Sequence, residues 1–512
     1  MSRVRKEEQM NQCETVSEKT ILGIDLGTSS VKVMLLDPQS GVLGTAAREY
    51  GVEIPTLGYA EQRPETWWAM TVEALQELRT QLPQAYAAVC AIGLSAQMHG
   101  LITVDANGDP VRPAMIWLDQ RSQQELAEIS QQMTFAEMKE IFHNRVFTGF
   151  LFPSLLWVKK HEPENYRKIA AVMLPKDFIR LKLTGCVGTD ASDASASCLG
   201  ATSRRDWAWE IIDRFGLRRE IFPPVHEATK IAGHTTAACA AQTGLKEGIP
   251  VVFGSADQPA QGVGNGQITE GTVICNIGTG GQISAYSAGA KYDPQLRIHT
   301  FGHAINRGYT IFGATLCAGM SLKWLRTKIL ENPSYDEINE MAAQIAPGSD
   351  GLLYLPYLSG ERTPLMNPSA SGLFWGLRLG HDKRHMIRAV MEGITFSLKD
   401  SMQIFEENNI PITGVIASGG GSNSPLWLQM QADIFGRPVR RSLVREQACL
   451  GACIVAGVGT GVFSGIQEAC GRFSWLDTRV YEPDPETVEI YRCAYANYRA
   501  VVETNVPLMK ER

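Results

Sequence analysis

Two short segments of the chain resemble each other, and each lies at the turn of a predicted β-hairpin. The first is IDLGTSS at residues 24–30, and the second is NIGTGG at residues 276–281. Apolar residues alternate on both sides of each turn, which is typical of hairpin strands. Glycine-rich turns leave backbone N–H groups open to an anion. We therefore expect two related units whose turns face each other and hold a polyphosphate between them.

The two turns differ at one aligned position, where Asp25 in the first corresponds to Asn276 in the second. A carboxylate suits a hydrated Mg²⁺, whereas a neutral amide adds no negative charge beside phosphate oxygens. Asp25 is thus the candidate metal residue. Alternatively, Asp25 only caps its own turn. The second Gly-Thr turn in a matching context makes that alternative less favoured. The candidate phosphate-binding residues are Gly27, Thr28, Gly278 and Thr279.

Length and composition restrict the class of protein. A chain of 512 residues predicts two domains. Hydrophobic residues make up 44% and charged residues 20%, as in globular proteins, and the net charge of −6 gives no basic surface for nucleic acid. The 11 cysteines lack paired spacing, which favours reduced thiols and a cytoplasmic location. No apolar run is long enough to span a membrane, so we expect no membrane partner.

Strand-like and helix-like stretches alternate through both halves, which indicates an α/β architecture. Helices are expected at residues 64–82, 382–406, 425–435 and 487–502. A loose Ala- and Thr-rich segment at residues 231–247 precedes a strand at 250–254, and we place the domain boundary there. The predicted division is a flexible tail at 1–19 without signal-peptide features, a first domain at 20–252, a second at 253–482 and a C-terminal helix at 483–512.

Three consecutive glycines form a second kind of turn. Gly419, Gly420 and Gly421 follow the strand predicted at 414–417, and Asn423 precedes a helix. A strand, a glycine turn and a helix allow a nucleotide to approach the backbone closely. A plain tight turn is the alternative. The spacing matches neither a Rossmann turn nor a P-loop, so nucleotide binding by those routes is excluded.

Asp257 lies just after a strand at the predicted domain junction. There it can act as a general base toward a substrate hydroxyl that attacks a γ-phosphoryl group. On local sequence alone, an N-cap for a helix that begins at Pro259 is the favoured alternative, and both roles are compatible.

A polyhydroxylated ligand needs an aromatic face beside hydrogen-bonding groups. The segments QMHG at 97–100 and WLDQR at 117–121 follow two strands and offer such groups. Taken singly, a structural role is the favoured alternative for each, with a histidine in the core and a solvated Asp-Arg pair. The candidate substrate-binding residues are Gln97, Met98, His99, Trp117 and Asp119.

With these residues described, the chain resembles the FGGY carbohydrate kinases, and among them the xylulokinases most closely. The similarity extends over residues 20–505 and includes IDLGTSSVK, GLSAQMHG, LPKDF, CNIGTGG, LPYLSGERTP and GGGSNSPLWLQMQADIFG. The resemblance implies two actin-like (ribonuclease H-like) ATPase domains that flank a deep cleft, with the sugar bound mainly by the first and MgATP by the second. It assigns the base to Asp257, the metal to Asp25 and the adenosine turn to Gly420 and Gly421.

The implied reaction is phosphorylation of a ketose by ATP with Mg²⁺, D-xylulose giving D-xylulose 5-phosphate. Three residues depart from the xylulokinase pattern, namely Leu118, Ser154 and Ala256. Other ketoses or polyols, such as L-xylulose or ribulose, are therefore alternative substrates. A non-catalytic actin-like ATP-binding protein and a sugar-sensing repressor are further alternatives. A homodimer is the default expectation for the assembly.

Overall fold

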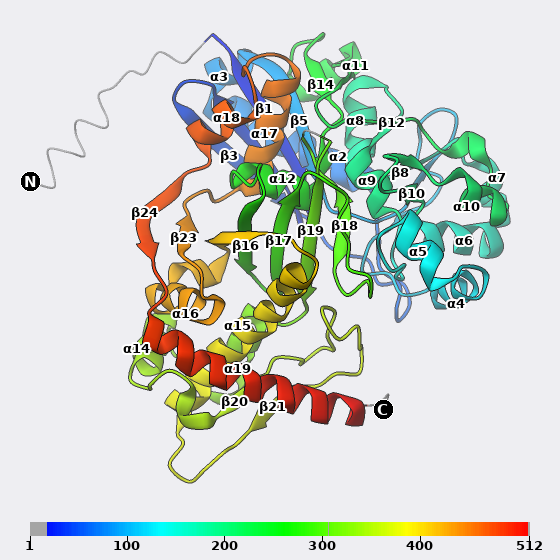
Figure 1. Cartoon of the computed structure of the whole chain (residues 1–512). Helices are drawn as coiled ribbons and strands as arrows, with labels where there is room; N and C mark the ends of the chain where they lie inside the picture. The colour runs from blue at the N-terminus through cyan, green and yellow to red at the C-terminus, as the bar shows by residue number, and fades with distance from the viewer. Residues whose placement is uncertain (1–17, 306, 510–512) are drawn as a thin grey trace, which may run out of the picture.

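The computed structural model describes residues 18–305 and 307–509, and it contains two α/β halves, the first at the top of Figure 1 and the second below it. Most of the tail predicted at residues 1–19 lies outside the described residues, as do the last three residues of the predicted C-terminal segment. Each half is built on one seven-stranded sheet. The predicted fold class is thereby confirmed.

The first sheet is centred on the first predicted hairpin. Strand β1 (Thr20–Leu26) pairs antiparallel with β2 (Ser30–Asp37) and parallel with β5 (Val89–Ala96). The sheet order is β13-β14-β5-β1-β2-β3, and β15 pairs with β5. The remaining members are β3 (Gly41–Glu49), β13 (Ile231–His234), β14 (Pro250–Val252) and β15 (Ser255–Ala256).

The second sheet repeats this arrangement. Strand β16 (Gly271–Ile277) pairs antiparallel with β17 (Gly281–Ser287) and parallel with β22 (Ile412–Ser418). The order is β18-β19-β17-β16-β22-β23-β24, with β18 (His299–Gly302), β19 (Tyr309–Thr315), β23 (Val439–Ser442) and β24 (Leu476–Tyr481). Both predicted hairpins therefore occupy equivalent central positions, as the sequence repeat indicated.

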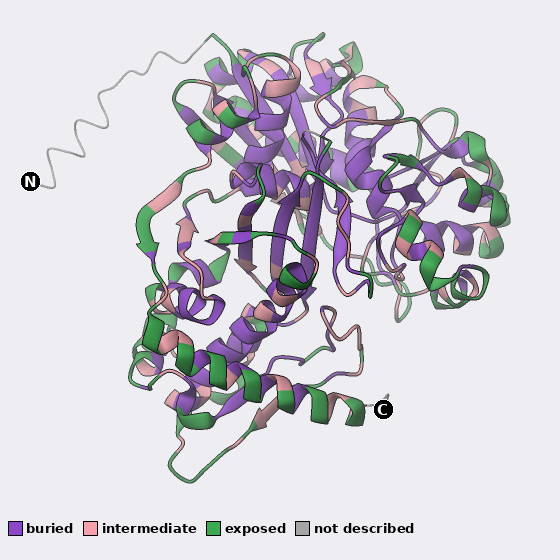
Figure 2. Cartoon of the chain, in the orientation of Figure 1, coloured by how far each residue is buried: buried purple, intermediate pink, exposed green. Residues whose placement is uncertain are grey.

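Helices cover both sheets. Helix α2 (Pro64–Gln81) packs on the first sheet, α15 (Lys383–Glu407) packs on the second, and α16 (Pro425–Phe435) and α19 (Pro485–Asn505) lie beside α15. These four elements match the predicted helices. The central strands of both sheets and the middle of α15 are largely buried, whereas the edge strands β3, β13 and β24 and turns of α19 are partly exposed (Figure 2).

The other helices are α3 (Pro83–Ala87), α4 (Gln123–Gln132), α5 (Phe135–Ile141), α6 (Leu151–His161), α7 (Pro163–Lys168), α8 (Pro175–Thr184), α9 (Ala191–Ala196), α10 (Trp209–Arg214), α11 (Ala237–Thr243), α12 (Asp257–Gly264), α13 (Gly319–Trp324), α14 (Tyr335–Ala343), α17 (Gln447–Gly459) and α18 (Ile466–Phe473). Short two-stranded pairs are formed by β4 (Glu61–Gln62) with β7 (Ala114–Met115), β6 (Ile102–Val104) with β8 (Ala171–Met173), β9 (Thr189–Asp190) with β12 (Val225–His226), β10 (Gly200–Ala201) with β11 (Asp206–Trp207), and β20 (Leu353–Leu355) with β21 (Leu373–Trp375).

Helix α17 joins the two halves. It follows the second sheet in sequence but packs on β1 and β5 of the first sheet and on α12. Glycines permit this close approach: a Cβ on Gly23 would lie 2.4 Å from the Cys449 oxygen, and a Cβ on Gly93 would lie 1.9 Å from the Ala452 oxygen. Residues of the predicted 253–482 segment thus contribute to the core of the first half. The division of the chain at residue 252 stays a prediction.

The expectation of a loose segment at residues 231–247 is wrong. Strand β13 pairs antiparallel with β14 there, and α11 follows it. The Thr236 side chain accepts a hydrogen bond from the Cys239 backbone and caps α11. Alanine favours a helix once such a cap is present, so the composition that suggested a linker forms regular structure.

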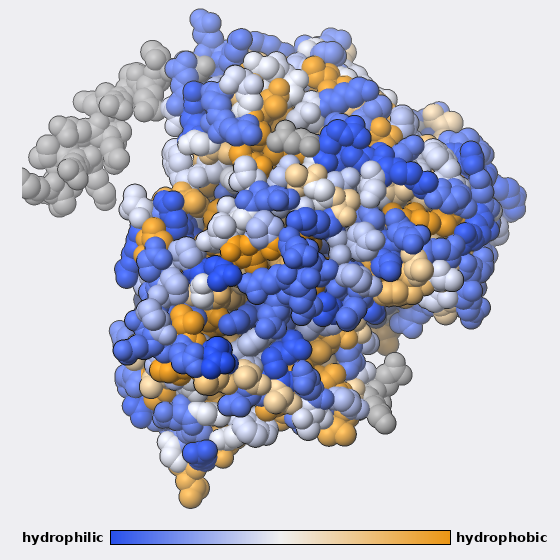
Figure 3. Space-filling model, in the orientation of Figure 1, coloured by the Kyte–Doolittle hydropathy of each residue, from blue (hydrophilic) through white to orange (hydrophobic). Residues whose placement is uncertain are grey.

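The surface in Figure 3 is mostly hydrophilic, and its hydrophobic residues form small separate groups. Among the residues that the structure describes, no helix has both the length and the apolar character needed to cross a bilayer.

Candidate active site

Two carboxylates meet at one edge of the first sheet. Asp25 on β1 is in register with Ser95 on β5, and Ser95 is in register with Ser255 on β15. Asp257 follows two residues later as the first residue of α12. All three strands run parallel, and ligands of α/β sheets bind at the carboxyl ends of such strands. The structure therefore brings together the predicted base and the predicted metal residue.

Asp257 has an unused oxygen. Its Oδ1 atom is buried and has no hydrogen-bond partner among the described residues. Burial, together with the negative charge of Asp25, raises the pKa of Asp257 to about 8. Helix α12 has Ala256 as its N-cap residue and no side-chain cap, so the N-cap alternative for Asp257 is wrong. Such a carboxylate is suited to accept a proton.

The Asp25 carboxylate does not cap its own turn. Its Oδ1 atom accepts a hydrogen bond of 2.9 Å from the Ser95 hydroxyl on the neighbouring strand. Burial raises the pKa of Asp25, and the Ser95 bond and Lys32 partly oppose the shift. The Lys32 Nζ atom lies 2.7 Å from Glu446 Oε2, just before α17. An ion pair between the two halves therefore lies beside the predicted metal residue.

Hydrogen bonds connect the first Gly-Thr turn to two of the predicted substrate-binding residues. The Thr28 hydroxyl accepts a hydrogen bond of 2.9 Å from Trp117 Nε1 and donates one of 3.1 Å to Gln97 Oε1. The Gly27 N–H donates to the Ser30 oxygen at 2.9 Å. In this state protein groups hold the Thr28 hydroxyl, so phosphate contact through that hydroxyl stays a prediction.

The second Gly-Thr turn is anchored to the start of α13. The carbonyl oxygen of Gly278 accepts from the Gly319 N–H at 2.9 Å, and that of Thr279 accepts from the Met320 N–H at 3.0 Å. The Thr279 side chain is exposed. On the neighbouring strand, Ser418 is in register with Asn276. This pairing matches that of Ser95 with Asp25, so the two candidate phosphate turns occupy equivalent places in their sheets.

Two of the three consecutive glycines, Gly419 and Gly421, lie so close to the neighbouring strand that a side chain would not fit. Gly419 has a φ of +74°, and a Cβ on it would lie 2.4 Å from Asn276 Oδ1. A Cβ on Gly421 would lie 2.7 Å from the Ile277 side chain. Gly420 is exposed, as a ligand-binding surface requires. Asn423 is tied to the neighbouring strand, because its Oδ1 accepts a bond of 2.6 Å from Arg441.

His99 is buried but keeps one nitrogen available. Its Nδ1 lies 2.8 Å from the Ala196 oxygen, and its ring stacks on Phe150 with centroids 3.8 Å apart. Burial lowers the pKa of His99 to about 3, and the Arg362 charge also lowers it. The ring is therefore neutral, and a proton on Nδ1 leaves Nε2 as an acceptor for a hydroxyl. The core-histidine alternative and the sugar-binding hypothesis are thus compatible.

Three other predicted sugar residues are buried and are held by contacts with the surrounding protein. Gln97 is buried, and its amide bonds the Thr28 hydroxyl and Gln62 Oε1. Asp119 is fully buried, accepts from the Ala60 N–H at 2.7 Å and binds the Arg121 guanidinium with both oxygens. Met98 is packed in an apolar cluster. The solvated-pair alternative for Asp119 is wrong, and direct contact of these residues with a sugar stays a prediction.

The three departures from the family pattern differ in environment. The Leu118 side chain is 42% exposed beside Trp117, so it leaves the buried bonds of Asp119 intact. Ser154 is fully buried in α6, and its hydroxyl has no partner among the described residues. Ala256 is buried in the same apolar cluster as Met98.

A buried charge cluster around Lys176, which could not be recognised in the sequence, lies next to the site. Lys176 on α8 is fully buried, and its Nζ lies 2.7 Å from Asp190, 2.6 Å from Asp193 and 3.0 Å from Asp177. Burial lowers the pKa of Lys176, but the three carboxylates together raise it above its ordinary value. Arg180 also pairs with Asp177, at 2.8 Å. The only signal was the LPKDF motif, which by itself does not show burial.

Helix α9 connects this cluster to the site. Asp190 caps the helix, and Asp193 lies within it. The Ser192 hydroxyl accepts a 2.9 Å hydrogen bond from the Ala256 N–H, next to Asp257, and the Ala196 oxygen bonds His99. The Lys176 cluster therefore helps to hold both the predicted base and the predicted sugar-side histidine.

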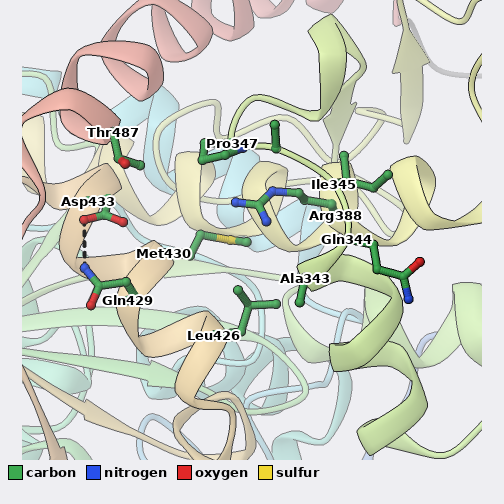
Figure 4. Close-up of a pocket in the computed structure, with 11 residues that line it drawn as sticks. Ala343, Gln344, Ile345, Pro347, Arg388, Leu426, Gln429, Met430, Asp433 and Thr487 are labelled. Carbon is green, nitrogen blue, oxygen red and sulfur yellow. Dashed lines mark hydrogen bonds between the residues drawn. The ribbon is translucent and has the colours of Figure 1, made fainter.

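A pocket of about 470 Å³ lies elsewhere in the second half (Figure 4). None of the predicted site residues lines it. Its charged groups are paired, because Arg388 bonds Glu392 and the Tyr491 hydroxyl, and Asp433 accepts from Gln429 and from the Asp484 N–H. Without an unpaired reactive group, this pocket is not the candidate active site.

Family models match both halves of the chain. The model for the N-terminal domain of the FGGY family of carbohydrate kinases matches residues 20–264, and the model for its C-terminal domain matches residues 273–460.

Individual proteins resemble the chain along almost its whole length. A xylulose kinase of Bacillus subtilis is 35% identical over 94% of this chain and 96% of its own. A crystal structure of a "xyloylose kinase" from Brucella ovis has a TM-score of 0.89 and 32% identity, and covers 96% of this chain and 100% of its own. A gluconokinase of Bacillus subtilis is 29% identical over 86% of this chain and 88% of its own.

Proposed function

Because the chain belongs to the FGGY family of carbohydrate kinases and is therefore a sugar kinase, we propose that it transfers the γ-phosphoryl group of ATP to a terminal hydroxyl of D-xylulose. The observation that carries this proposal is the buried, unpartnered Oδ1 of Asp257 beside Asp25. The choice of D-xylulose is supported by relatives that carry the name xylulose kinase and match nearly the whole chain.

Asp257 acts as the general base. As the sugar hydroxyl approaches the γ-phosphorus, its proton passes to the carboxylate, a bond forms between the hydroxyl oxygen and phosphorus, and the bond to the bridging oxygen breaks to release ADP. The two Gly-Thr turns hold the phosphates in line with that hydroxyl. Positioning of this kind contributes about 7–11 kcal/mol to lowering a barrier.

The donor set near Asp25 fits a magnesium ion. Mg²⁺ is commonly held by one or two carboxylates together with waters and substrate phosphates. Asp25 supplies one carboxylate, and within the described residues no group of three or more potential metal ligands occurs. Bound there, Mg²⁺ would neutralise charge on the phosphates, while Asp25 and the Ser95 hydroxyl would orient it.

The proposal is tested by a coupled ADP-release assay over a panel of sugars. D-xylulose is expected to give the highest kcat/KM among D-xylulose, L-xylulose, D-ribulose, xylitol and gluconate. A wild-type enzyme that phosphorylates another member of the panel more efficiently would contradict the D-xylulose assignment while leaving the kinase chemistry intact. No sugar-dependent ADP release with any member would contradict both.

The pKa of Asp257 predicts the pH dependence of the reaction. The base must be ionised, and its pKa is raised to about 8. We expect kcat/KM for the sugar, which reports groups of the free enzyme, to fall as the pH decreases through about 8. A cation near Asp25 favours the ionised form of Asp257, so the acid limb of kcat is expected at a lower pH than that of kcat/KM. A kcat/KM that stays constant through pH 8 would contradict this assignment.

A further inference from the structure

The predicted sugar residues Gln97, Met98, His99, Trp117 and Asp119 of the first half together form what we call the sugar wall. Arg362 belongs to the second half and lies over the Trp117 ring of this wall. It lies in the loop after β20, and its backbone is fixed to β19. The Thr363 N–H donates to the Ala314 oxygen at 3.0 Å, and the Thr363 hydroxyl accepts from the Ala314 N–H at 3.2 Å. The Glu361 carboxylate accepts from the Leu316 N–H at 2.9 Å and from the Arg362 N–H at 2.7 Å. The base of the side chain is therefore held firmly.

The Arg362 guanidinium contacts an aromatic ring but has no polar partner among the described residues. Its Cζ lies 5.6 Å from the centroid of the Trp117 ring, and it makes no hydrogen bond or ion pair with any residue that the structure describes. Burial lowers the pKa of Arg362. Arg362 is half-buried, whereas each buried arginine among the described residues pairs with a carboxylate, as seen in Arg112 with Glu61, Arg180 with Asp177, Arg205 with Glu227 and Arg388 with Glu392.

The groups around the guanidinium include Trp117 and His99 of the sugar wall and His299 on β18 of the second half. Its charge contributes to lowering the pKa values of His99 and His299, so it lies close to both rings. The charge of Glu361 opposes the effect of burial on the pKa of Arg362, and neither Asp25 nor Asp257 contributes to that shift. The guanidinium is thus set apart from the reacting carboxylates but close to Trp117 and His99.

A desolvated guanidinium without a partner favours a ligand with oxygen acceptors. Both a sugar and a phosphate offer such acceptors. The separation from Asp25 and Asp257 favours the part of the sugar that lies far from the reacting hydroxyl. In a 2-ketose that reacts at its opposite terminal hydroxyl, that part carries the carbonyl group.

We propose that Arg362 completes the sugar site from the second half of the molecule by donating hydrogen bonds to the carbonyl end of the bound ketose. The inference rests on the proposed function and assigns a specificity role to a residue of the nucleotide-side half. Since Arg362 belongs to one half and Trp117 to the other, sugar binding engages both halves before any phosphoryl transfer.

The test replaces Arg362 with Met, which keeps the length of the side chain but removes its donors. We expect KM for D-xylulose to rise about 10- to 100-fold, the loss of a hydrogen bond that involves a charged group. KM for ATP is expected to change less than about twofold. Arg362→Lys keeps the charge without the planar fork, so its KM is expected between those of the wild type and Arg362→Met. Arg378→Met, at an exposed arginine of the same half, serves as the matched control.

Equilibrium binding without ATP separates the outcomes. Arg362→Met is expected to weaken binding of D-xylulose more than binding of xylitol, which lacks the carbonyl group. Equal weakening of both, an unchanged KM for D-xylulose, or a rise confined to the KM for ATP would each overturn the assignment. If the wild-type enzyme phosphorylates no sugar, the proposed function fails instead. Melting curves of all three variants check that each is folded.

Discussion

Asp257→Asn is expected to lower kcat by about 10²- to 10⁴-fold, the usual contribution of a general base, and also to make the protein without ligands more resistant to heat. Asn has nearly the same shape as Asp but cannot accept the hydroxyl proton. The affinity for ATP is expected to stay within a factor of about three, because Asp257 is not among the proposed phosphate- and adenosine-binding residues. Single-turnover kinetics and ATP titration measure the two effects.

The gain in stability follows from the raised pKa of Asp257. Its value is about 8 in the folded protein and 3.8 in the unfolded chain. The folded state therefore binds the proton more tightly, and this carboxyl increasingly destabilises the fold as the pH rises from 3.8 to about 8. Since Asn never ionises, the variant is expected to show the largest rise in melting temperature above pH 8 and none below pH 3.8.

The two readouts together distinguish a base from a structural residue. A variant that lost activity because of damage to the fold would lose stability as well. Asp109→Asn, at an exposed carboxylate of the first half, is the control, and it is expected to change neither kinetics nor melting. An Asp257→Asn enzyme with full turnover would remove Asp257 from its proposed role.

The parts of the site that could be predicted from the sequence are those with local chemistry. The two hairpins were predictable because alternating apolar strands flank glycine turns, and the structure places Asp25 and Asn276 at equivalent positions of their sheets. The run of three glycines likewise predicted a turn without side chains, although the contacts with Asn276 and Ile277 that require glycine there arise only in the fold.

Features that depend on contacts between distant segments could not be predicted. Nothing within residues 447–459 indicates that α17 packs on the first sheet, because its apolar residues suit a core in either half. The position of Arg362 beside Trp117 depends on contacts of Thr363 with β19, and the charge cluster of Lys176 depends on Asp190 and Asp193 at α9. In the sequence, charged residues at such spacings resemble ordinary solvated surface residues. The family resemblance therefore suggested roles for residues of the site, but it did not indicate the distant contacts that hold those residues in place.

The buried charge cluster around Lys176 gives the prediction with the largest effect on stability. The Lys176 ammonium is fully buried among Asp177, Asp190 and Asp193, and Arg180 is the one other cation that pairs with these carboxylates in the described part of the chain. Burial, together with the two other carboxylates, raises the pKa of Asp193 to about 7 even though Lys176 opposes the shift. The cluster therefore already holds a carboxyl group that is close to protonation, and it tolerates no loss of positive charge.

Lys176→Met is expected to lower the free energy of unfolding by about 3–5 kcal/mol, the usual consequence of leaving buried charges without their partner. Urea and thermal denaturation of the whole chain measure the loss, with Lys168→Met at an exposed position as the control. Adding Asp193→Asn removes one uncompensated charge and is expected to restore part of the stability. A Lys176→Met protein within about 0.5 kcal/mol of the wild type would contradict this role. Because α9 also holds Ala256 and His99, whatever folded protein remains is expected to bind sugar more weakly, which connects the buried cluster to the site above it.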